Sequence, residues 1–367
     1  MSLSKPVVRV AAAVIGLLLL YLSLWPVPVD PVAWHAPADA GLTDPFESND
    51  ILSRARLLDI AGHEGPEDIA GGPDGMIYAS ARNGVIVRMR EDGSGLEVFA
   101  DTGGRPLGIE FDGAGHLYVA NSYLGIQKVS ADGSVQLLVN SYQGQPIEYA
   151  NDIAVAANGQ IYFSDSSSKF GAAGRGGTYE ASLLDILEHG GHGRIFEFDP
   201  ASGSLAVIAD NLNYANGVAI SSNQEYLVIS ETGHYRVWRQ WLKGPQKGQR
   251  EVILDNLPGF PDNINNGFNE RFWVGLVAPR NALLDRLSDD PGLRKVVQRL
   301  PSFVRPKATP STHVIAITGD GEVLMNLQDP AALLPAVTGA FETRDAIWLS
   351  SLFGHHIGRM DKSRLIE

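Results

Sequence analysis

The sequence predicts an all-β fold: a six-bladed β-propeller with an N-terminal transmembrane helix and short helical insertions in its loops. Two observations carry this prediction, a strand–turn–strand unit that recurs six times and a single apolar segment at the N-terminus. The 40 glycines among 367 residues agree with a fold that needs many tight turns. We expect a cytoplasmic tip and signal-anchor helix at 1–25, a Pro-rich tether at 26–50 and one large propeller domain at 51–367.

The N-terminal segment VAAAVIGLLLLYLSLW is apolar, and Lys5 and Arg9 precede it. With the residues just before it, the run reaches the lower end of the length that spans a bilayer, about 17–25 residues. The basic residues predict a single-pass anchor with the propeller on the periplasmic, extracytoplasmic side. A cleaved signal peptide is the alternative, although small residues suited to cleavage occur only at 36–40. The Pro-rich stretch that follows is typical of a stiff, extended tether.

The repeating unit is a short apolar strand, a polar turn and a second apolar strand. The six units are DIAGGPDGMIYAS from Asp68, GIEFDGAGHLYVANS from Gly108, DIAVAANGQIYFSDS from Asp152, GVAISSNQEYLVISET from Gly217, NINNGFNERFWVGL from Asn263 and TGAFETRDAIWLSS from Thr338. Further apolar runs such as VIVRM and LEVFA often follow, so a unit supplies four short strands. A unit of four strands that recurs at intervals of roughly forty residues or more is typical of a propeller blade.

Ring closure can be predicted from the two ends of the repeat. The last unit ends after IGRMDKS without a clear fourth strand, and the segment SRARLLDI before the first unit belongs to no unit. We expect this N-terminal segment to supply the missing strand, which closes the ring and removes an exposed sheet edge.

Composition excludes several classes of function. The net charge is −13, and the propeller contains no block of Lys or Arg, so we expect no binding of nucleic acid. The chain has no cysteine, which excludes disulfides and thiol chemistry.

Four residues with oxygen-bearing side chains stand at the same place in four of the units, just before the first apolar strand: Glu67, Asn151, Asn216 and Asp262. If the units radiate around an axis, these side chains meet at one end of it. Oxygen donors without His or Cys suit Ca²⁺ or another divalent cation such as Mg²⁺, and neutral carbonyl donors favour Ca²⁺. A single Asn or Asp before a strand more often bonds the local backbone in a turn. Four in register favour a metal site.

The motifs GRPLGI, IYFSDSSSKF, GRIFEFDP, ANGVAI, WLKGP, LPGFPDN and FWVGL resemble the strictosidine-synthase-like branch of the gluconolactonase/SMP-30 superfamily, from about residue 60 onward. The resemblance implies a six-bladed propeller with a divalent cation, usually Ca²⁺, in its central channel. The ligand positions of the family fall on Glu67, Asn151, Asn216 and Asp262. Asn263 is a further candidate ligand, by similarity to the related paraoxonases.

The resemblance has gaps that bear on the reaction. Strictosidine synthases carry a catalytic Glu in the last blade, where this chain has Thr338, and Glu342 is out of register with it. The paired cysteines of the plant enzymes are also missing. We therefore do not expect strictosidine synthase activity, the Pictet–Spengler condensation. Leu107 occupies the place of the histidine that the paraoxonases carry before the second blade.

Hydrolysis is the chemistry that such a cation favours. A Ca²⁺ ion with open positions polarises an ester or lactone carbonyl and stabilises the oxyanion formed by attack of water. We expect a calcium-dependent hydrolase of lactones or aryl esters acting in the central channel. The candidates for the general base are His234, His355 and His356, whose loops return to the ligand face. The resemblance to the family implies Asp262, as ligand and base together, as the alternative.

Two long loops, 171–193 and 278–306, carry leucines and valines at helical spacing. They are either helices packed on the rim or an apolar lid over the metal, which would favour hydrophobic substrates and also reach the membrane. Two other functions remain open: a non-catalytic, calcium-stabilised binding propeller, and a metal-assisted lyase or isomerase. The physiological substrate does not follow from the sequence.

Overall fold

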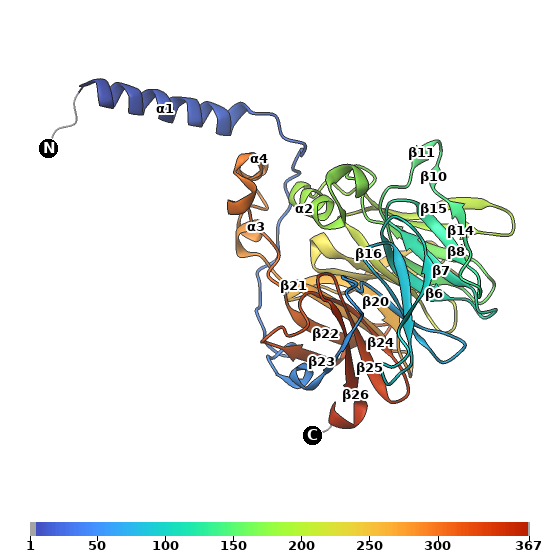
Figure 1. Ribbon diagram of the computed structural model, residues 1–367. Helices are drawn as coiled ribbons and strands as arrows, with labels where there is room; N and C mark the ends of the chain where they lie inside the picture. The colour runs from blue at the N-terminus through green and yellow to red at the C-terminus, as the bar shows by residue number, and fades with distance from the viewer. Residues whose placement is uncertain (1–4, 366–367) are drawn as a thin grey trace.

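Each of the six repeated units folds into one four-stranded antiparallel sheet. The computed structural model describes residues 5–365, and the six sheets are arranged as the blades of a propeller (Figure 1). The innermost strand of every blade contacts the innermost strands of its two neighbours, so these strands form a closed ring. The predicted all-β, six-bladed fold is therefore confirmed.

The strands of the first three blades, each from the innermost outward, have the following bounds. Blade 1 has β2 (Ile69–Gly71), β3 (Ile77–Ser80), β4 (Val85–Met89) and β5 (Glu97–Asp101). Blade 2 has β6 (Pro106–Phe111), β7 (Leu117–Asn121), β8 (Gly125–Val129) and β9 (Val135–Val139). Blade 3 has β12 (Ala150–Val155), β13 (Ile161–Asp165), β14 (Gly193–Asp199) and β15 (Ser204–Leu212). A small hairpin of β10 (Ser141–Tyr142) and β11 (Gln145–Pro146) connects the second blade to the third.

The other three blades follow the same order. Blade 4 has β16 (Ala215–Ile220), β17 (Tyr226–Glu231), β18 (Arg236–Trp241) and β19 (Arg250–Leu254). Blade 5 has β20 (Gly259–Asn266), β21 (Phe272–Pro279), β22 (Thr312–Ile317) and β23 (Val323–Asp329). Blade 6 has β24 (Val337–Glu342), β25 (Ala346–Ser351), β26 (His356–Asp361) and, outermost, β1 (Arg56–Asp59).

The N-terminal strand closes the ring, as the strand count predicted. β1 pairs antiparallel with β26, from Arg56 opposite Arg359 to Asp59 opposite His356. The first strand of the domain is thus held in the last blade, and the outer edge of β26 is covered. Apolar clusters fill the spaces between neighbouring blades, for example around the fully buried Trp273 between blades 5 and 6.

Carboxylates of the innermost strands also join neighbouring blades inside the channel. In each case a carboxylate oxygen of one blade accepts a hydrogen bond from a backbone amide of another blade. The three bonds are Asp68 Oδ2 with Ile109 N at 2.9 Å, Glu110 Oε2 with Val155 N at 2.7 Å, and Asp152 Oδ2 with Val218 N at 2.8 Å. The channel is therefore lined with acidic groups that have a structural role.

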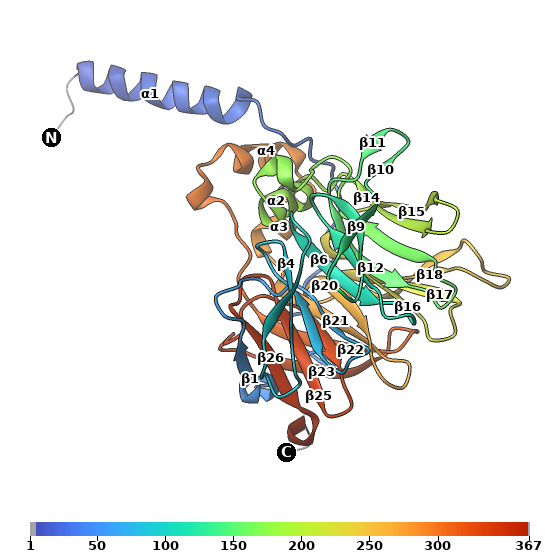
Figure 2. The same cartoon turned by 45° about the vertical axis from the view of Figure 1, so that its right-hand side comes forward.

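The helices lie together at one end of the propeller (Figures 1 and 2). These helices are α2 (Thr178–Glu188), α3 (Ala282–Arg286) and α4 (Pro291–Arg299). Elsewhere and between them, the chain forms short 3₁₀ turns: η1 (Ile51–Arg54), η2 (Ala173–Arg175), η3 (Thr232–His234), η4 (Ser302–Val304) and η5 (Lys362–Leu365). Asp290 caps α4, because its side chain accepts a hydrogen bond from Leu293 N at 2.9 Å and Pro291 occupies the first turn. The helices fall within the two long loops, as predicted.

Helix α1 (Lys5–Leu24) stands away from the propeller, and none of its side chains is buried (Figure 1). Its mean hydropathy of 2.4 and its 20 residues are sufficient to cross a membrane. The segment that follows is extended, in keeping with its prolines, and it is docked against the propeller. Val29 is fully buried, and Phe46 belongs to the apolar cluster around blade 5.

The acidic channel leads to a prediction about pH. Burial raises the pKa of Glu110 from 4.5 to about 8, so the folded state binds a proton that the unfolded state releases. The contribution of Glu110 to stability is complete below the unfolded pKa and is lost as pH rises through the folded pKa. We expect Glu110→Gln to raise Tm by about 2–5 °C at pH 9 and to change it little at pH 5. Thermal unfolding by circular dichroism measures this.

The exposed Glu322 provides the control, because Glu322→Gln removes the same charge from the surface. If the Tm of Glu110→Gln equals the Tm of the wild type and of Glu322→Gln at every pH, the prediction is contradicted.

Candidate metal centre

The four predicted ligand residues meet at one cavity of about 640 Å³. Asn151, Asn216 and Asp262 lie at the beginning of β12, β16 and β20, and Glu67 lies just before β2. Because these are all innermost strands in the same orientation, the shared register brings the side chains to one end of the channel. All four residues are at most 6% exposed, and all four line the cavity.

Hydroxyl groups orient the amides of the two candidate ligands Asn151 and Asn216. Asn151 Nδ2 donates to Ser166 Oγ at 2.8 Å, and Asn216 Nδ2 donates to Thr232 Oγ1 at 3.1 Å. Ser166 Oγ donates in turn to the carbonyl of Ala215, directly before Asn216, at 2.7 Å. Thr232 Oγ1 likewise donates to the carbonyl of Pro261, directly before Asp262, at 2.7 Å. With the amide nitrogens held in this way, the amide oxygens are turned away from these partners.

Three buried oxygen atoms at this place are left without a partner. Glu67 Oε2, Asn151 Oδ1 and Asn216 Oδ1 have no hydrogen bond within the described residues. A buried acceptor without a partner costs about 1–3 kcal/mol, so three in one cavity indicate a ligand that they bind. Two carboxylates and two amides fit a hard cation such as Ca²⁺. Within residues 5–365 there is no cluster of three or more His, Cys, Asp or Glu side chains that could hold a metal ion.

The electrostatics of the site agree with a cation. Burial and the neighbouring Asp262 raise the pKa of Glu67, which the guanidinium of Arg105 partly offsets. Burial also raises the pKa of Asp262, to about 7. The ionised forms of both carboxylates are therefore disfavoured without a positive charge between them. Arg105 is itself fully buried and donates to Gly65 O at 3.2 Å, which places a fixed cation behind the site.

Asn263 lies beside the site in a supporting position. Its Nδ2 donates to Glu67 O at 2.9 Å, and Thr338 Oγ1 donates to the same carbonyl at 2.7 Å. Both side chains therefore hold the backbone of Glu67. Asn263 Oδ1 is buried and has no partner within residues 5–365, so it stays a candidate ligand. Glu342 is directed elsewhere and binds Trp273 Nε1 at 2.9 Å.

The three candidate histidines lie outside the cavity wall that the described residues form. The side chain of His355 is 59% exposed and lies 4.0 Å from Glu64. His356 begins β26, opposite Asp59 of β1. His234 is bound between other side chains, with Nδ1 at 2.7 Å from Glu231 and Nε2 at 2.9 Å from His189. Of the four predicted bases, Asp262 is the one that the structure places on the cavity.

Two tyrosines that the sequence reasoning missed line the cavity beside the ligands. The hydroxyl oxygens of Tyr149 and Tyr214 are 2.5 Å apart, and the Tyr149 hydroxyl donates to Thr178 O at 2.5 Å. Burial raises the pKa of both phenols, so both stay protonated. The signal was present in the sequence, because the triplet YAN ends in a candidate ligand at both Asn151 and Asn216.

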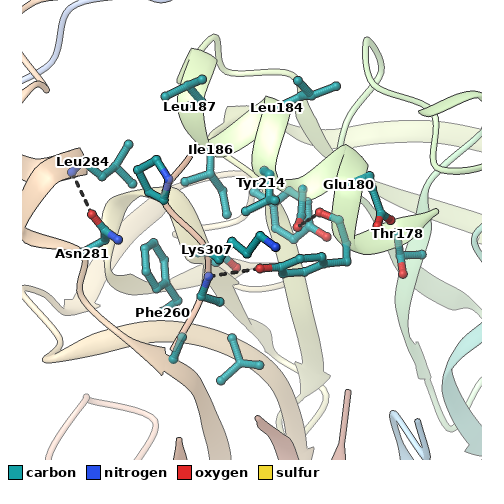
Figure 3. A pocket seen from close by; sticks show the side chains of 18 of the residues that line it. Thr178, Glu180, Leu184, Ile186, Leu187, Tyr214, Phe260, Asn281, Leu284 and Lys307 are labelled. Carbon is teal, nitrogen blue, oxygen red and sulfur yellow. Dashed lines mark hydrogen bonds between the residues drawn. The ribbon is translucent and has the colours of Figure 1, made fainter. Parts of the chain in front are cut away.

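The rest of the wall comes mainly from the helical insertions. Figure 3 shows side chains of α2 and α3 around the cavity together with Phe260 of β20 and Lys307. The apolar lining residues of the insertions include Leu183, Leu184, Leu187, Leu283, Leu284, Leu287 and Val297. Polar groups follow toward the loop 302–309, where Tyr179 Oη accepts a hydrogen bond from Ala308 N at 3.1 Å. The insertions thus form an apolar cover over the ligand residues.

Comparison with known proteins places the chain in a family. The family model described as strictosidine synthase matches residues 151–245, and the model of the strictosidine synthase-like N-terminal region matches residues 44–89. The chain is 32% identical to the adipocyte plasma membrane-associated protein of Salmo salar over 87% of its own length and 81% of that protein. The chain belongs to the strictosidine synthase-like family. Protein STRICTOSIDINE SYNTHASE-LIKE 6 of Arabidopsis thaliana is 30% identical over 89% of this chain and 88% of that protein.

Solved structures resemble this member of the strictosidine synthase-like family in fold. A gluconolactonase from Xanthomonas campestris aligns with a TM-score of 0.61 and 19% identity, covering 84% of this chain and 89% of that one. Regucalcin from Agrobacterium tumefaciens, described as a calcium-binding protein, aligns with a TM-score of 0.59 and 13% identity, covering 83% and 92%. Both likenesses show the propeller fold of the SMP-30/gluconolactonase proteins.

The hydroxyl that orients Asn216 gives a prediction for this family member. Thr232→Val removes the acceptor of Asn216 Nδ2, so the amide is free to rotate and its oxygen is no longer held toward the cavity. Loss of such a supporting contact typically lowers metal affinity by about 10–100-fold, and we expect a loss of this size for Ca²⁺. Isothermal titration of calcium into chelator-treated protein measures it.

Thr102→Val is the matched control. Thr102 is a buried threonine whose hydroxyl donates to Gly84 O at 2.7 Å, far in the sequence from any ligand amide. Equal calcium affinity in Thr232→Val, Thr102→Val and the wild type would show that the hydroxyl does not support the site.

Proposed function

We propose that this chain is a calcium-dependent hydrolase of lactones or aryl esters. The observation that carries the proposal is the group of buried, unpartnered oxygen atoms of Glu67, Asn151 and Asn216, which join Asp262 at a cavity with apolar walls. A site of this kind combines hard oxygen donors with space for an organic substrate. The names of the structural neighbours, a gluconolactonase and a calcium-binding regucalcin, support the same class of function.

Glu67, Asn151, Asn216 and Asp262 would hold the Ca²⁺ ion, with Asn263 as a further candidate. When bound, the ion supplies positive charge that polarises a carbonyl group and stabilises the developing oxyanion. Arg105 lies behind Glu67 and adds a second, permanent positive charge to the site. The apolar cover lowers the effective dielectric constant around the ion, which strengthens these electrostatic interactions.

In the proposed reaction, Asp262 acts as the general base. Its carboxylate accepts a proton from a water molecule whose oxygen attacks the ester or lactone carbonyl, and the carbon–oxygen bond to the leaving group then breaks. We assign to Tyr214 the donation of a proton to the leaving oxygen, after which the proton that Asp262 took from water restores the Tyr214 hydroxyl. The oxygens of the two phenols lie 2.5 Å apart, and Tyr149 now donates to Thr178 O. If the Tyr149 hydroxyl donates to the Tyr214 oxygen instead, the Tyr214 hydroxyl is free to donate into the cavity. The products are a carboxylic acid and an alcohol, or a hydroxy acid from a lactone.

The cavity wall favours hydrophobic small-molecule substrates. Leucines of α2 and α3 and Phe260 line the cavity and offer apolar surface to an acyl chain or aryl ring. We also propose that α1 is a single-pass anchor and that the propeller is on the extracytoplasmic side, because Lys5 and Arg9 precede or begin the apolar core of the helix.

The first test is a panel of lactones and aryl esters, assayed with calcium and with chelator. We expect turnover that chelation removes and calcium restores. Asn216→Ala removes one oxygen donor to the cation, so we expect kcat/KM to fall by about 10²–10³-fold. The fold of this variant should be retained. Asn158→Ala, an exposed asparagine of a blade turn, should keep full activity.

The outcome of this test separates the proposal from its alternatives. Background turnover in all samples, together with calcium-dependent thermal stability, would favour a calcium-stabilised binding propeller. Ring opening of a cyclic substrate without uptake of ¹⁸O from labelled water would favour a lyase or isomerase.

A second prediction concerns the phenol pair. Tyr214→Phe removes the proposed donor to the leaving oxygen, so we expect kcat to fall by about 10²-fold or more for alkyl esters and lactones. The effect should be much smaller for aryl esters, whose leaving groups need no proton, and calcium affinity should be unchanged. Tyr162→Phe is the control, because its hydroxyl binds Glu197 on the blade surface at 3.0 Å. Equal losses for both substrate types would contradict this role.

A further inference from the structure

The segment between the anchor helix and the propeller is short and leads directly to the cavity. Helix α1 ends at Leu24, Pro28 lines the cavity, and Val29 is fully buried. Four residues of extended chain reach at most about 14 Å. If α1 spans a bilayer, the part of the propeller that holds Val29 must therefore lie at the membrane surface.

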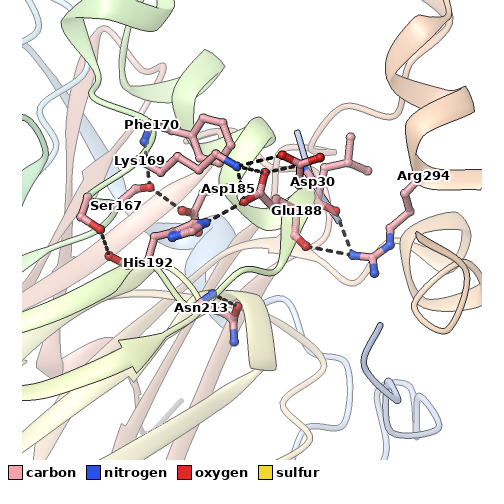
Figure 4. A network of polar contacts seen from close by, with 12 residues as sticks. Asp30, Ser167, Lys169, Phe170, Asp185, Glu188, His192, Asn213 and Arg294 are labelled. Carbon is pink, nitrogen blue, oxygen red and sulfur yellow. Dashed lines mark hydrogen bonds and ion pairs between the residues drawn. The ribbon is translucent and has the colours of Figure 1, made fainter. Parts of the chain in front are cut away.

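Polar contacts fasten this segment to the helices of the cover (Figure 4). Asp30 N donates to Glu188 Oε2 at 2.7 Å, and the Asp30 carboxylate is 3.0 Å from Lys295 of α4. Although burial opposes its ionisation, hydrogen bonds from His192 and Lys169 lower the pKa of Glu188 to about 2, so it stays charged. The segment is thus held against both α2 and α4.

Two further contacts join α4 to this N-terminal region. Arg294 is fully buried, and its guanidinium donates to Val32 O and to Leu187 O, the latter at 2.9 Å. Arg299 Nε donates to Trp25 O at 2.6 Å, and its own carbonyl accepts from the Tyr21 hydroxyl at 3.0 Å. Helix α4 is therefore held beside the end of α1, as both views of the ribbon show (Figures 1 and 2).

The surface next to this junction is apolar and basic. Phe303 is 80% exposed, Val304 51% and Leu293 47%. Residues 291–307 contain no acidic side chain and five basic ones, of which Arg294 is buried and the other four are at least partly exposed, although the whole chain carries a net charge of −13. Several residues of the same segment, among them Ser302 and Arg305, also line the cavity. An exposed apolar tip with a basic surround suits the interface of an anionic bilayer.

We propose that α4 and η4 rest on the anionic surface of the bilayer that α1 crosses, with Phe303 and Val304 inserted among the lipids. The cavity then opens at the membrane, and a lipophilic ester or lactone enters it from the lipid phase. The docking of the surface rests on α1 being a membrane anchor, and the nature of the substrate rests on the proposed function. The docking can be measured without any assay of activity.

The absence of cysteine from the chain allows a direct experiment. The full-length Phe303→Cys protein, labelled with a polarity-sensitive dye and reconstituted in vesicles of phosphatidylglycerol and phosphatidylcholine, should show quenching by lipids with a nitroxide near the headgroup. Leu324→Cys is the matched control, because Leu324 is a 45% exposed apolar residue of β23. The strand β23 lies on the side of the propeller away from α1 (Figure 1). Carbonate-resistant flotation of both proteins confirms the anchor separately.

We expect quenching of the Phe303 label at least about fivefold stronger than that of the Leu324 label, decreasing when Arg305 and Lys307 are both changed to Glu. Equal, weak quenching of the two labels in proteins that float with the vesicles would overturn the proposal. For entry from the lipid phase, Phe303→Ser should raise KM for a long-chain lactone in vesicles and leave KM for a short, water-soluble lactone unchanged. A hydrolase assay that fails for both substrates would overturn the proposed function and leave the docking result standing.

Discussion

The site depends on one constraint, the convergence of buried polar side chains from separate blades on the propeller axis. A closed ring of innermost strands turns a repeated sequence position into a cluster of oxygen atoms, three of which lack a partner within residues 5–365. Such a cluster is unfavourable by itself, because buried carboxylates repel each other and unpaired acceptors have lost water. A divalent cation removes both costs at once. The same cation would therefore stabilise the ring and provide the electrophile of the site.

Sequence alone predicted what the repeat encodes. The register of the six units gave the blades, the closure by β1 and the four cavity residues, because a position that recurs in each unit occupies an equivalent place in each blade. Features outside the repeat were not predictable in this way. Arg105 reaches Glu67 from the start of blade 2, and Ser166 and Thr232 act on amides 15 and 16 residues earlier in the chain. The loops that carry His355 and His234 follow no period, so strand geometry could not show where their side chains point.

The helical insertions were also only partly predictable from the sequence. Helical spacing predicted that helices occur in the loops 171–193 and 278–306, but it could not distinguish packing on the rim from covering the cavity. The difference is made by contacts between residues far apart in sequence, such as Arg294 with the carbonyl of Val32, and Lys295 with Asp30. The prolines of the N-terminal segment likewise predicted an extended chain and gave no sign that Val29 would be buried.

Charge distribution connects the two proposals. The chain as a whole is acidic, yet its basic residues 291–307 stand beside the anchor helix. An acidic propeller is repelled by an anionic membrane, so a tether that was free would hold it away from the surface. The docked segment and the local basic patch would act against this repulsion at one place, the rim of the cavity. Leucines of α2 and α3 line the cavity behind that rim, so orientation toward the bilayer would bring this apolar lining close to the phase in which hydrophobic esters and lactones are concentrated.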